Sequence, residues 1–125
     1  MEQLILEPQK KTLDINCANG SIHMSGNSLL QDPKAFFKPV VDWIIEYVKN
    51  PALKTVVTLK FEYIDTSSVQ SIFDILGLLK AIPDTDNRVI VNWHYELDDP
   101  ELLEVGEIME GRLKLIFNYI DYSEN

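Results

Sequence analysis

The first quarter of the chain alternates between apolar and polar residues, a pattern that predicts β-strands. A short apolar run at residues 4–6 comes first, and alternation with period two follows on both sides of Asn19-Gly20. Alternation places the apolar side chains on one face of a strand, and an Asn-Gly pair between two such segments is typical of a hairpin turn. We therefore expect a strand and then a β-hairpin, with Cys17 as a small core residue rather than a nucleophile.

The rest of the chain predicts helices that alternate with strands. Asp32-Pro33 and Asp99-Pro100 are helix-start pairs, because Asp caps the first turn and Pro fits the first helical position. Apolar residues recur at helical spacing after each pair, and also between Val69 and Leu79. Pro39 either kinks the first helix or marks the start of its regular part. The remaining expectations are strands at 55–63, 88–95 and 113–120, a loop at 83–87, and Gly111 as a left-handed residue ending the last helix.

This order of elements predicts the fold class. Helices that alternate with strands favour right-handed crossovers and parallel pairing, whereas the hairpin adds an antiparallel part. We expect one α/β domain over residues 1–125, with a mixed, mostly parallel sheet of four to six strands, an N-terminal hairpin and about three helices packed on the sheet.

The charge balance excludes some classes of partner. The chain has 11 basic and 20 acidic residues among 125, a formal net charge of −9. Nucleic acids and anionic membrane surfaces both attract clustered Lys and Arg, so neither is an expected partner. No stretch approaches the roughly 20 apolar residues of a membrane span, and the N-terminus does not read as a signal peptide. With Cys17 as the single cysteine, we expect a cytoplasmic protein without membrane insertion.

The sequence offers few residues for catalysis. It contains neither a Gly-x-Ser-x-Gly elbow nor a Gly-rich phosphate loop, and we expect no cofactor. His94, Glu96 and Asp98 have period-two spacing, so a strand running that far would project all three from one face. They could then hold the metal of a metal-dependent hydrolase. The simpler interpretation, which we favour, is the solvent face of a strand that runs into a polar loop.

A row of acidic residues follows that strand. The segment 96–110 carries seven acids and no Lys or Arg, and four of the acids fall at i, i+3 spacing on one side of the last helix: Glu101, Glu104, Glu107 and Glu110. This face could dock a basic partner, as in a constitutive acidic scaffold protein. It could equally be a solvated face that keeps the protein soluble.

The most informative segment is Asp65-Thr66-Ser67-Ser68, where a strand gives way to a helix. A helix start exposes unpaired N–H groups and the positive end of the helix dipole, which together stabilise a phosphate. One of the three hydroxyls could therefore be a reversible phosphorylation site, with its neighbours as the helix cap. Alternatively, all four residues are capping and turn residues.

Several segments together resemble the SiaC family of bacterial regulatory phosphoproteins. Residues 61–68 resemble its Tyr-x-Asn-Thr-Ser-Ser motif, and residues 26–28 its Gly-x-Ser. Residues 36–47 are similar to its Phe-Tyr-x-Pro-Leu-x-x-Trp-Leu-x-x-Tyr helix, and residues 91–107 to its Val-Asn-Trp-Tyr-Tyr…Asp-Asp…Leu-Glu-x-Gly-Glu block. This chain has Asp65 where the family has Asn, and Leu29-Leu30-Gln31-Asp32-Pro33 where the family has Tyr-Pro-Glu-Asn.

The resemblance implies a fold like that of STAS or anti-sigma-factor-antagonist domains, and a regulatory protein rather than an enzyme. Family members are phosphorylated by a partner protein kinase on the Thr of this motif, here Thr66, and dephosphorylated by a Ser/Thr phosphatase. The unphosphorylated form binds and activates a diguanylate cyclase, which raises cyclic-di-GMP and favours biofilm formation. Asp65, Ser67 and Ser68 would be the neighbours and helix cap of the phosphosite. Candidate partner-binding residues are Tyr63, Glu101, Glu104 and Glu107.

Overall fold

The structure, a computed structural model, describes residues 1–7 and 13–123. Its strands are β1 (Leu4–Leu6), β2 (Leu13–Ala18), β3 (Ser21–Ser28), β4 (Thr55–Ile64), β5 (Val89–Glu96) and β6 (Ile116–Tyr122). Its helices are α1 (Pro33–Tyr47), α2 (Thr66–Leu78), the single turn α3 (Thr85–Arg88) and α4 (Pro100–Leu113), with a 3₁₀ turn η1 (Leu79–Ala81) after α2. The predicted order of strands and helices is confirmed.

The six strands form one mixed sheet in the order in which they occur along the chain. β1, β2 and β3 pair antiparallel, and β3 to β6 pair parallel, so the expected hairpin lies at one side of a parallel sheet. Ala18 pairs with Ser21 across the hairpin turn, and Gly20 takes a φ of +84°, which its missing Cβ allows. The register between β3 and β4 shifts between Gly26 and Asn27, close to the end of both strands.

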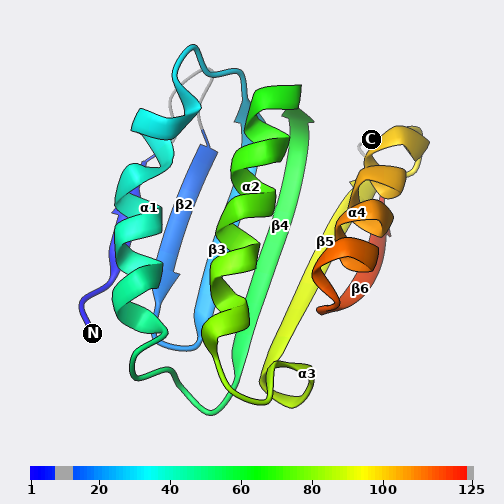
Figure 1. Cartoon of the computed structure of the whole chain (residues 1–125). Coiled ribbons are helices and arrows are strands. Elements are labelled where there is room, and N and C mark those ends of the chain that lie inside the picture. The colour runs from blue at the N-terminus through cyan, green and yellow to red at the C-terminus, as the bar shows by residue number, and fades with distance from the viewer. Residues whose placement is uncertain (8–12, 124–125) are drawn as a thin grey trace.

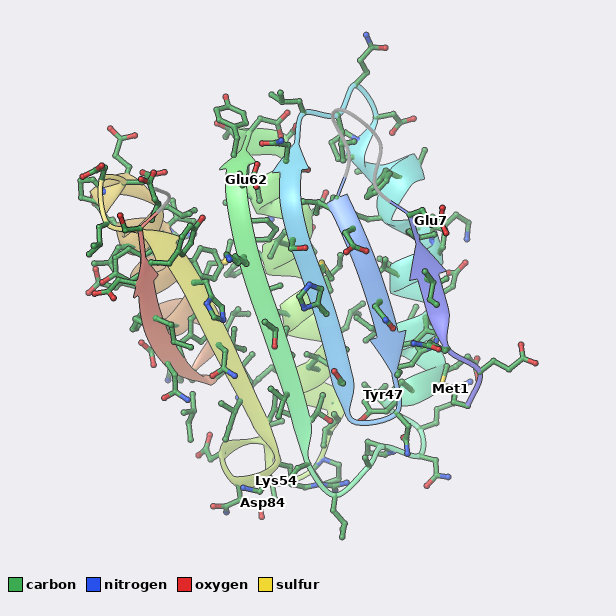
Figure 2. The ribbon with its side chains drawn as sticks, turned by 180° about the vertical axis from the view of Figure 1, so that it is seen from behind. Met1, Glu7, Tyr47, Lys54, Glu62 and Asp84 are labelled. Atoms are coloured by element: carbon green, nitrogen blue, oxygen red, sulfur yellow. The ribbon has the colours of Figure 1, made fainter. Side chains whose placement is uncertain are left out.

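All three long helices cover the same face of the sheet (Figure 1). Each of the crossovers through α1, α2 and α4 joins neighbouring parallel strands and advances in the same direction across the sheet. Right-handed crossovers that advance in one direction put their helices on one face. The opposite face carries no helix of the described chain (Figure 2). The parallel pairing has a second consequence. The carboxyl ends of β3, β4 and β5 lie at the same end of the sheet, and the helices that follow these strands begin there.

The core lies between the sheet and its helices. Trp93 on β5 is fully buried between Phe61 and Phe117 of the neighbouring strands, at ring-centroid distances of 5.8 and 6.0 Å. Its indole N–H donates to the carbonyl of Leu102 in α4, at 3.1 Å. Cys17 is fully buried, and burial raises the pKa of its thiol to about 12, so the prediction of a core cysteine is confirmed.

Three local predictions are wrong. The segment 83–87, expected as a loop, contains the start of α3, and Asp84 before it is left-handed with a φ of 58°. Gly111 does not end the last helix, which continues to Leu113; Lys114 takes the left-handed conformation instead, and its N–H bonds the Glu110 carbonyl at 2.8 Å. The last strand accordingly spans 116–122 rather than 113–120.

Pro39 lies inside α1, and the helix runs on through it without a break. The helix begins, as predicted, at the pair Asp32-Pro33, where the Asp32 carboxylate accepts a hydrogen bond from the N–H of Ala35 at 3.2 Å. Within the described part of the chain, no helix is both long and apolar enough to cross a membrane.

Candidate functional site

Asp65 caps the start of α2, as the sequence predicts. Its backbone is extended, with φ −82° and ψ 168°, and its Oδ1 accepts a hydrogen bond from the N–H of Ser68 at 2.9 Å. Its own N–H donates to the carbonyl of Ser28 at 3.1 Å, which holds the turn against the end of β3. Thr66 is therefore the first residue of the helix, beside the unpaired N–H groups of its first turn.

The Asp65 carboxylate has two further partners. Oδ1 also accepts from the Ser67 hydroxyl at 3.2 Å, and Oδ2 accepts from the N–H of Leu30, in the segment before α1, at 3.3 Å. Burial acts to raise the pKa of this carboxyl, but the hydrogen bonds from Ser68, Ser67 and Leu30 outweigh it, so the pKa is lower than usual. The group that ties α2 to the loop before α1 is thus a stable anion.

The three hydroxyls after Asp65 have different surroundings. Ser68 is fully buried, and its Oγ accepts a hydrogen bond from the equally buried Ser28 at 2.7 Å. Ser67 is exposed but donates to Asp65. Thr66 is exposed, and no described residue hydrogen-bonds its hydroxyl. Of the three, Thr66 is thus the hydroxyl that is both accessible and unpaired.

Sequence reasoning treated Ser67 and Ser68 alike, and it missed Ser28 as part of the site. A signal for Ser68 was present, because Ser68, Ile72 and Leu76 are spaced by four and form one buried side of α2. For Ser28 the sequence offered only its place in the Gly-x-Ser segment, since its partner lies 40 residues further along the chain.

An acidic hollow lies beside the start of α2. It has a volume of about 160 Å³ and is lined by Glu62 and Tyr63 from β4, Asp99 before α4 and Glu101 in its first turn, together with Ile64, Val69, Leu102 and Val105. Tyr63 is the second-last residue of β4, and it is 52% exposed. The predicted partner-binding residues Tyr63 and Glu101 are thus brought together.

The other acids of α4 take different positions. Glu104 and Glu107 are exposed and do not line the hollow. Glu110 does not continue the solvated row: its carboxylate accepts from the N–H of Phe117 at 3.1 Å and from the hydroxyl of Tyr119 at 2.7 Å. Burial, followed by this bond to Glu110, raises the pKa of Tyr119. Glu110 therefore holds α4 to the edge strand β6.

The alternative metal site is not formed. β5 ends at Glu96, and a turn follows in which the N–H of Asp99 donates to the Glu96 carbonyl at 2.9 Å, so Asp98 does not extend the strand. Among the described residues, no group of three or more His, Cys, Asp and Glu is placed to hold a metal ion. The pKa of His94 is lowered by partial burial and then by the positive charge of Lys60 on the neighbouring strand.

These features define a small α/β domain that presents an open threonine hydroxyl at a helix start. The model of the SiaC family of regulatory phosphoproteins matches residues 6–122, and the chain therefore belongs to that family. A curated relative, an uncharacterised protein of Pseudomonas aeruginosa strain UCBPP-PA14, is 27% identical over 88 residues, which are 70% of each chain.

Solved structures of SiaC from Pseudomonas aeruginosa share the fold. The apo form superposes with a TM-score of 0.85 at 24% identity, over 96% of this chain and 99% of that one. A second SiaC structure gives 0.79 at 25% identity, over 99% and 100%. A third, of the diguanylate cyclase SiaD in complex with its activator SiaC, gives 0.83 at 23% identity, over 95% and 99%.

Proposed function

We propose that this protein is a phosphorylation-switched regulatory binding protein that acts through its partners rather than as an enzyme. In this proposal the unphosphorylated form of residues 1–125, a single cytoplasmic domain, binds and activates a diguanylate cyclase. A partner kinase and a Ser/Thr phosphatase switch it at Thr66. Support for the cyclase comes from membership of the SiaC family and from the fold shared with an activator seen in complex with its cyclase.

The observation that carries the choice of Thr66 is its open hydroxyl. Kinase and phosphatase both need an oxygen that they can reach, and Ser68 is fully buried against Ser28. The fold itself makes little use of the Thr66 side chain, because Asp65 supplies the helix cap. A phosphate at this position would add a charge of about −1.5 to −2 to the surface and leave the cap in place.

Charge explains why the phosphate would act on binding. The described residues that line the hollow next to the start of α2 include three carboxylates, those of Glu62, Asp99 and Glu101, and no Lys or Arg. A phosphate there finds no cation in the hollow, so a partner that covers it must strip water from an unpaired dianion. That desolvation costs roughly several kcal/mol. A screened attraction between charges on the two surfaces contributes only about 0 to 1 kcal/mol, which does not offset it. Phosphorylation should therefore release the partner.

The test begins with the modification itself. The protein is incubated with its kinase and ATP, and the modified residue is located by mass spectrometry, with Thr66→Ala and Ser67→Ala as a matched pair. Phosphate should appear in the wild type and in Ser67→Ala, and should be lost from Thr66→Ala. Phosphate retained by Thr66→Ala contradicts the assignment.

Cyclase binding is then compared in a pull-down. Thr66→Ala should bind whether or not the kinase is present, and Thr66→Glu should bind at least about tenfold more weakly. Ser21→Glu adds the same charge at an exposed position at the start of β3 and should bind like the wild type. If substitutions at Thr66 leave cyclase binding unchanged, and binding weakens steadily as the salt concentration rises, the acidic-scaffold alternative is favoured.

A further inference from the structure

The side chains on the face of the sheet that bears no helix form a surface of their own, which we call the open face (Figure 2). Along each strand these side chains alternate with the buried ones that point toward the helices. No described element covers them, and most are half-buried by their neighbours. The open face lies on the other side of the sheet from α2, and so from Thr66.

The open face has a basic cluster at its centre, formed by His23, Lys60 and His94. His94 on β5 is opposite Lys60 on β4. His23 on β3 is opposite Thr58, two residues before Lys60. Neighbouring strands lie only about 4.8 Å apart, and residues two apart along a strand about 6.6 Å. The pKa of His94 is lowered by partial burial and then by the positive charges of Lys60 and His23, so the three groups lie close enough to influence one another.

The described part of the chain does not neutralise the basic cluster. Its ion pairs lie on or just after α1, and none includes Lys60. The Lys60 ammonium instead lies over the ring of Tyr122, 4.5 Å from the ring centroid. His23 shares a hydrogen bond with Ser25, whose Oγ is 3.2 Å from its Nε2. The basic cluster can therefore still pair with carboxylates that a partner brings.

The other titratable groups on the open face of β2–β6 surround the basic cluster. They are the carboxylates of Asp14, Glu62 and Glu96 and the phenol of Tyr122. Asp14 on β2 lies two strands away from Lys60. Glu62 on β4 and Glu96 on β5 follow the cluster by two residues, toward the carboxyl ends of their strands. Repulsion from these carboxylates would keep an acidic partner away from the carboxyl ends of the strands.

Toward the amino ends of β4–β6, the open face is uncharged within the strands. Val56, Ile90 and Ile116 are opposite one another on β4, β5 and β6 and form an apolar row, in which Ile116 is 42% exposed. Thr58 and Asn92 lie between this apolar row and the basic cluster. Apolar residues with few charges are typical of the centre of a protein interface. The part of the open face that suits an interface therefore adjoins the part that attracts carboxylates.

We propose that the basic cluster and the apolar row together dock an acidic segment of another protein, whose carboxylates contact the cluster and whose apolar side chains cover the row. Charge complementarity carries the choice of partner, because the cluster is positive and has no ion pair within the described chain. This inference does not rest on the proposed function, since the surface lies across the sheet from Thr66.

A defined peptide tests the surface. A short synthetic peptide combines glutamates and leucines with serines, and in its two controls glutamine or lysine replaces glutamate. Each peptide is titrated into the isotope-labelled full chain at low salt and followed by backbone NMR. The acidic peptide should shift the amides of Thr58, Lys60, Asn92 and His94, and neither control should do so. The absence of shifts, shifts confined to the helices, or equal binding of the glutamine peptide overturns the proposal.

Two pairs of matched variants locate the contact. Lys60→Gln removes a charge from the basic cluster, and Lys34→Gln removes one from an exposed position on α1. A pair of exposed charges is worth about twofold to fivefold in affinity, so only Lys60→Gln should weaken the peptide by that factor. Ile116→Ala and Ile45→Ala truncate isoleucines that are 42% and 43% exposed. Covering the exposed part of Ile116 is worth about threefold to eightfold, and only its loss should weaken the peptide. Equal effects within either pair contradict the proposal.

The affinity should also rise as the pH falls. A partner carboxylate beside His94 stabilises the charged imidazolium, so binding raises the pKa of His94 from its lowered value. An increase of one pKa unit corresponds to about tenfold in affinity, which is present at acidic pH and is lost as the pH rises through the raised value. The dissociation constant is measured from about pH 6 to about pH 8 for the wild type and for His94→Gln. An affinity independent of pH, or an equal dependence in His94→Gln, contradicts the proposal.

Two measurements separate this partner from other occupants of the open face. Light scattering should give the same molar mass for the wild type and for Ile116→Ala; a mass that falls in the variant would assign the surface to a second copy of this chain. The protein should not sediment with phosphatidylserine vesicles; sedimentation that Lys60→Gln abolishes would assign the surface to a membrane. Either result overturns the inference, and neither affects the proposed function, which is tested at Thr66 and with the cyclase.

Discussion

Replacing Asp65 by asparagine tests whether the start of α2 depends on a negative charge or on cap geometry alone. The carboxylate accepts hydrogen bonds from the N–H of Ser68, the hydroxyl of Ser67 and the N–H of Leu30. An asparagine keeps one acceptor oxygen for Ser68, but its amide nitrogen is a donor. That nitrogen would face the N–H of Leu30, and the bond between α2 and the segment before α1 would be lost.

The size of the effect follows from these contacts. Loss of the bond from Leu30 costs about 1 kcal/mol. Loss of a negative charge at a helix N-terminus adds about 0.3 to 1 kcal/mol. Asp65→Asn should therefore lower the free energy of unfolding by about 1 to 2 kcal/mol at neutral pH.

The same contacts predict how this loss depends on pH. The pKa of Asp65 lies below its ordinary value of 3.8 in the folded protein, so the folded state holds the charged form more tightly than the unfolded state does. Its contribution to stability is complete above the unfolded value and disappears as the pH falls through the folded value. The difference between wild type and Asp65→Asn should thus be full at neutral pH and should shrink below about pH 4.

The assay is urea unfolding at neutral and at acidic pH, followed by tryptophan fluorescence. Asp99→Asn is the matched control, because Asp99 caps α4 through a single bond from the N–H of Leu102, at 3.1 Å, and asparagine keeps that bond. The control loses the same charge at a helix start but has no bond to lose from a second segment, so it should lose only about 0.3 to 1 kcal/mol. Equal losses in the two variants, or a difference for Asp65→Asn that persists at acidic pH, would refute the reasoning.

Two further predictions concern packing. Ser68→Ala leaves the buried Ser28 hydroxyl without its partner and should cost about 1 to 3 kcal/mol, whereas adding Ser28→Ala should cost less than the two single changes summed, as a double-mutant cycle in urea would show. Gly106→Ala places a Cβ 2.8 Å from the buried ring of Trp93 and should cost about 1 to 3 kcal/mol in thermal unfolding; Gly111→Ala, which meets open space, should not destabilise the protein.

Local signals predicted most of the fold. The hairpin at Asn19-Gly20 and the capped starts at Asp32, Asp65 and Asp99 are all where the sequence places them. Each of these features depends on a few neighbouring residues: a glycine with positive φ, or a carboxylate that reaches an N–H three residues ahead. Such features can be predicted from the sequence, because all the residues that determine them lie within one short segment.

The end of α4 could not be predicted in this way. Gly111 is the residue type that usually ends a helix, but α4 continues because Leu113 and Leu115 are buried beyond it. Glu110 is held by Phe117 and Tyr119 of β6, a contact made only once the sheet has formed. Tertiary packing therefore overrides the local preference, and Lys114 adopts the left-handed turn instead.

In the candidate site, too, the sequence predicts some features, whereas others depend on tertiary packing. Its position at the end of β4 follows from the sequence, but the distinction among its hydroxyls depends on β3. Ser28 reaches the start of α2 because β3 and β4 pair in parallel and end together, with Ser28 opposite Ile64. That pairing buries Ser68 and leaves Thr66 outside it.

At this helix start, the residues that stabilise the fold are different from the residue that we propose is modified, as a switch requires. Asp65 and Ser68 hold α2 in place, one as the cap and the other as the buried contact to Ser28. Thr66 lies between them and makes neither the cap nor the buried contact. A charge added to its oxygen would therefore change the surface with little loss of folding stability. A regulatory protein needs this separation, because a modification that unfolded the domain would abolish every partner's binding instead of selecting among partners. The three wrong local predictions lie outside this segment, whose cap, helix start and open hydroxyl sit within a few residues of one another.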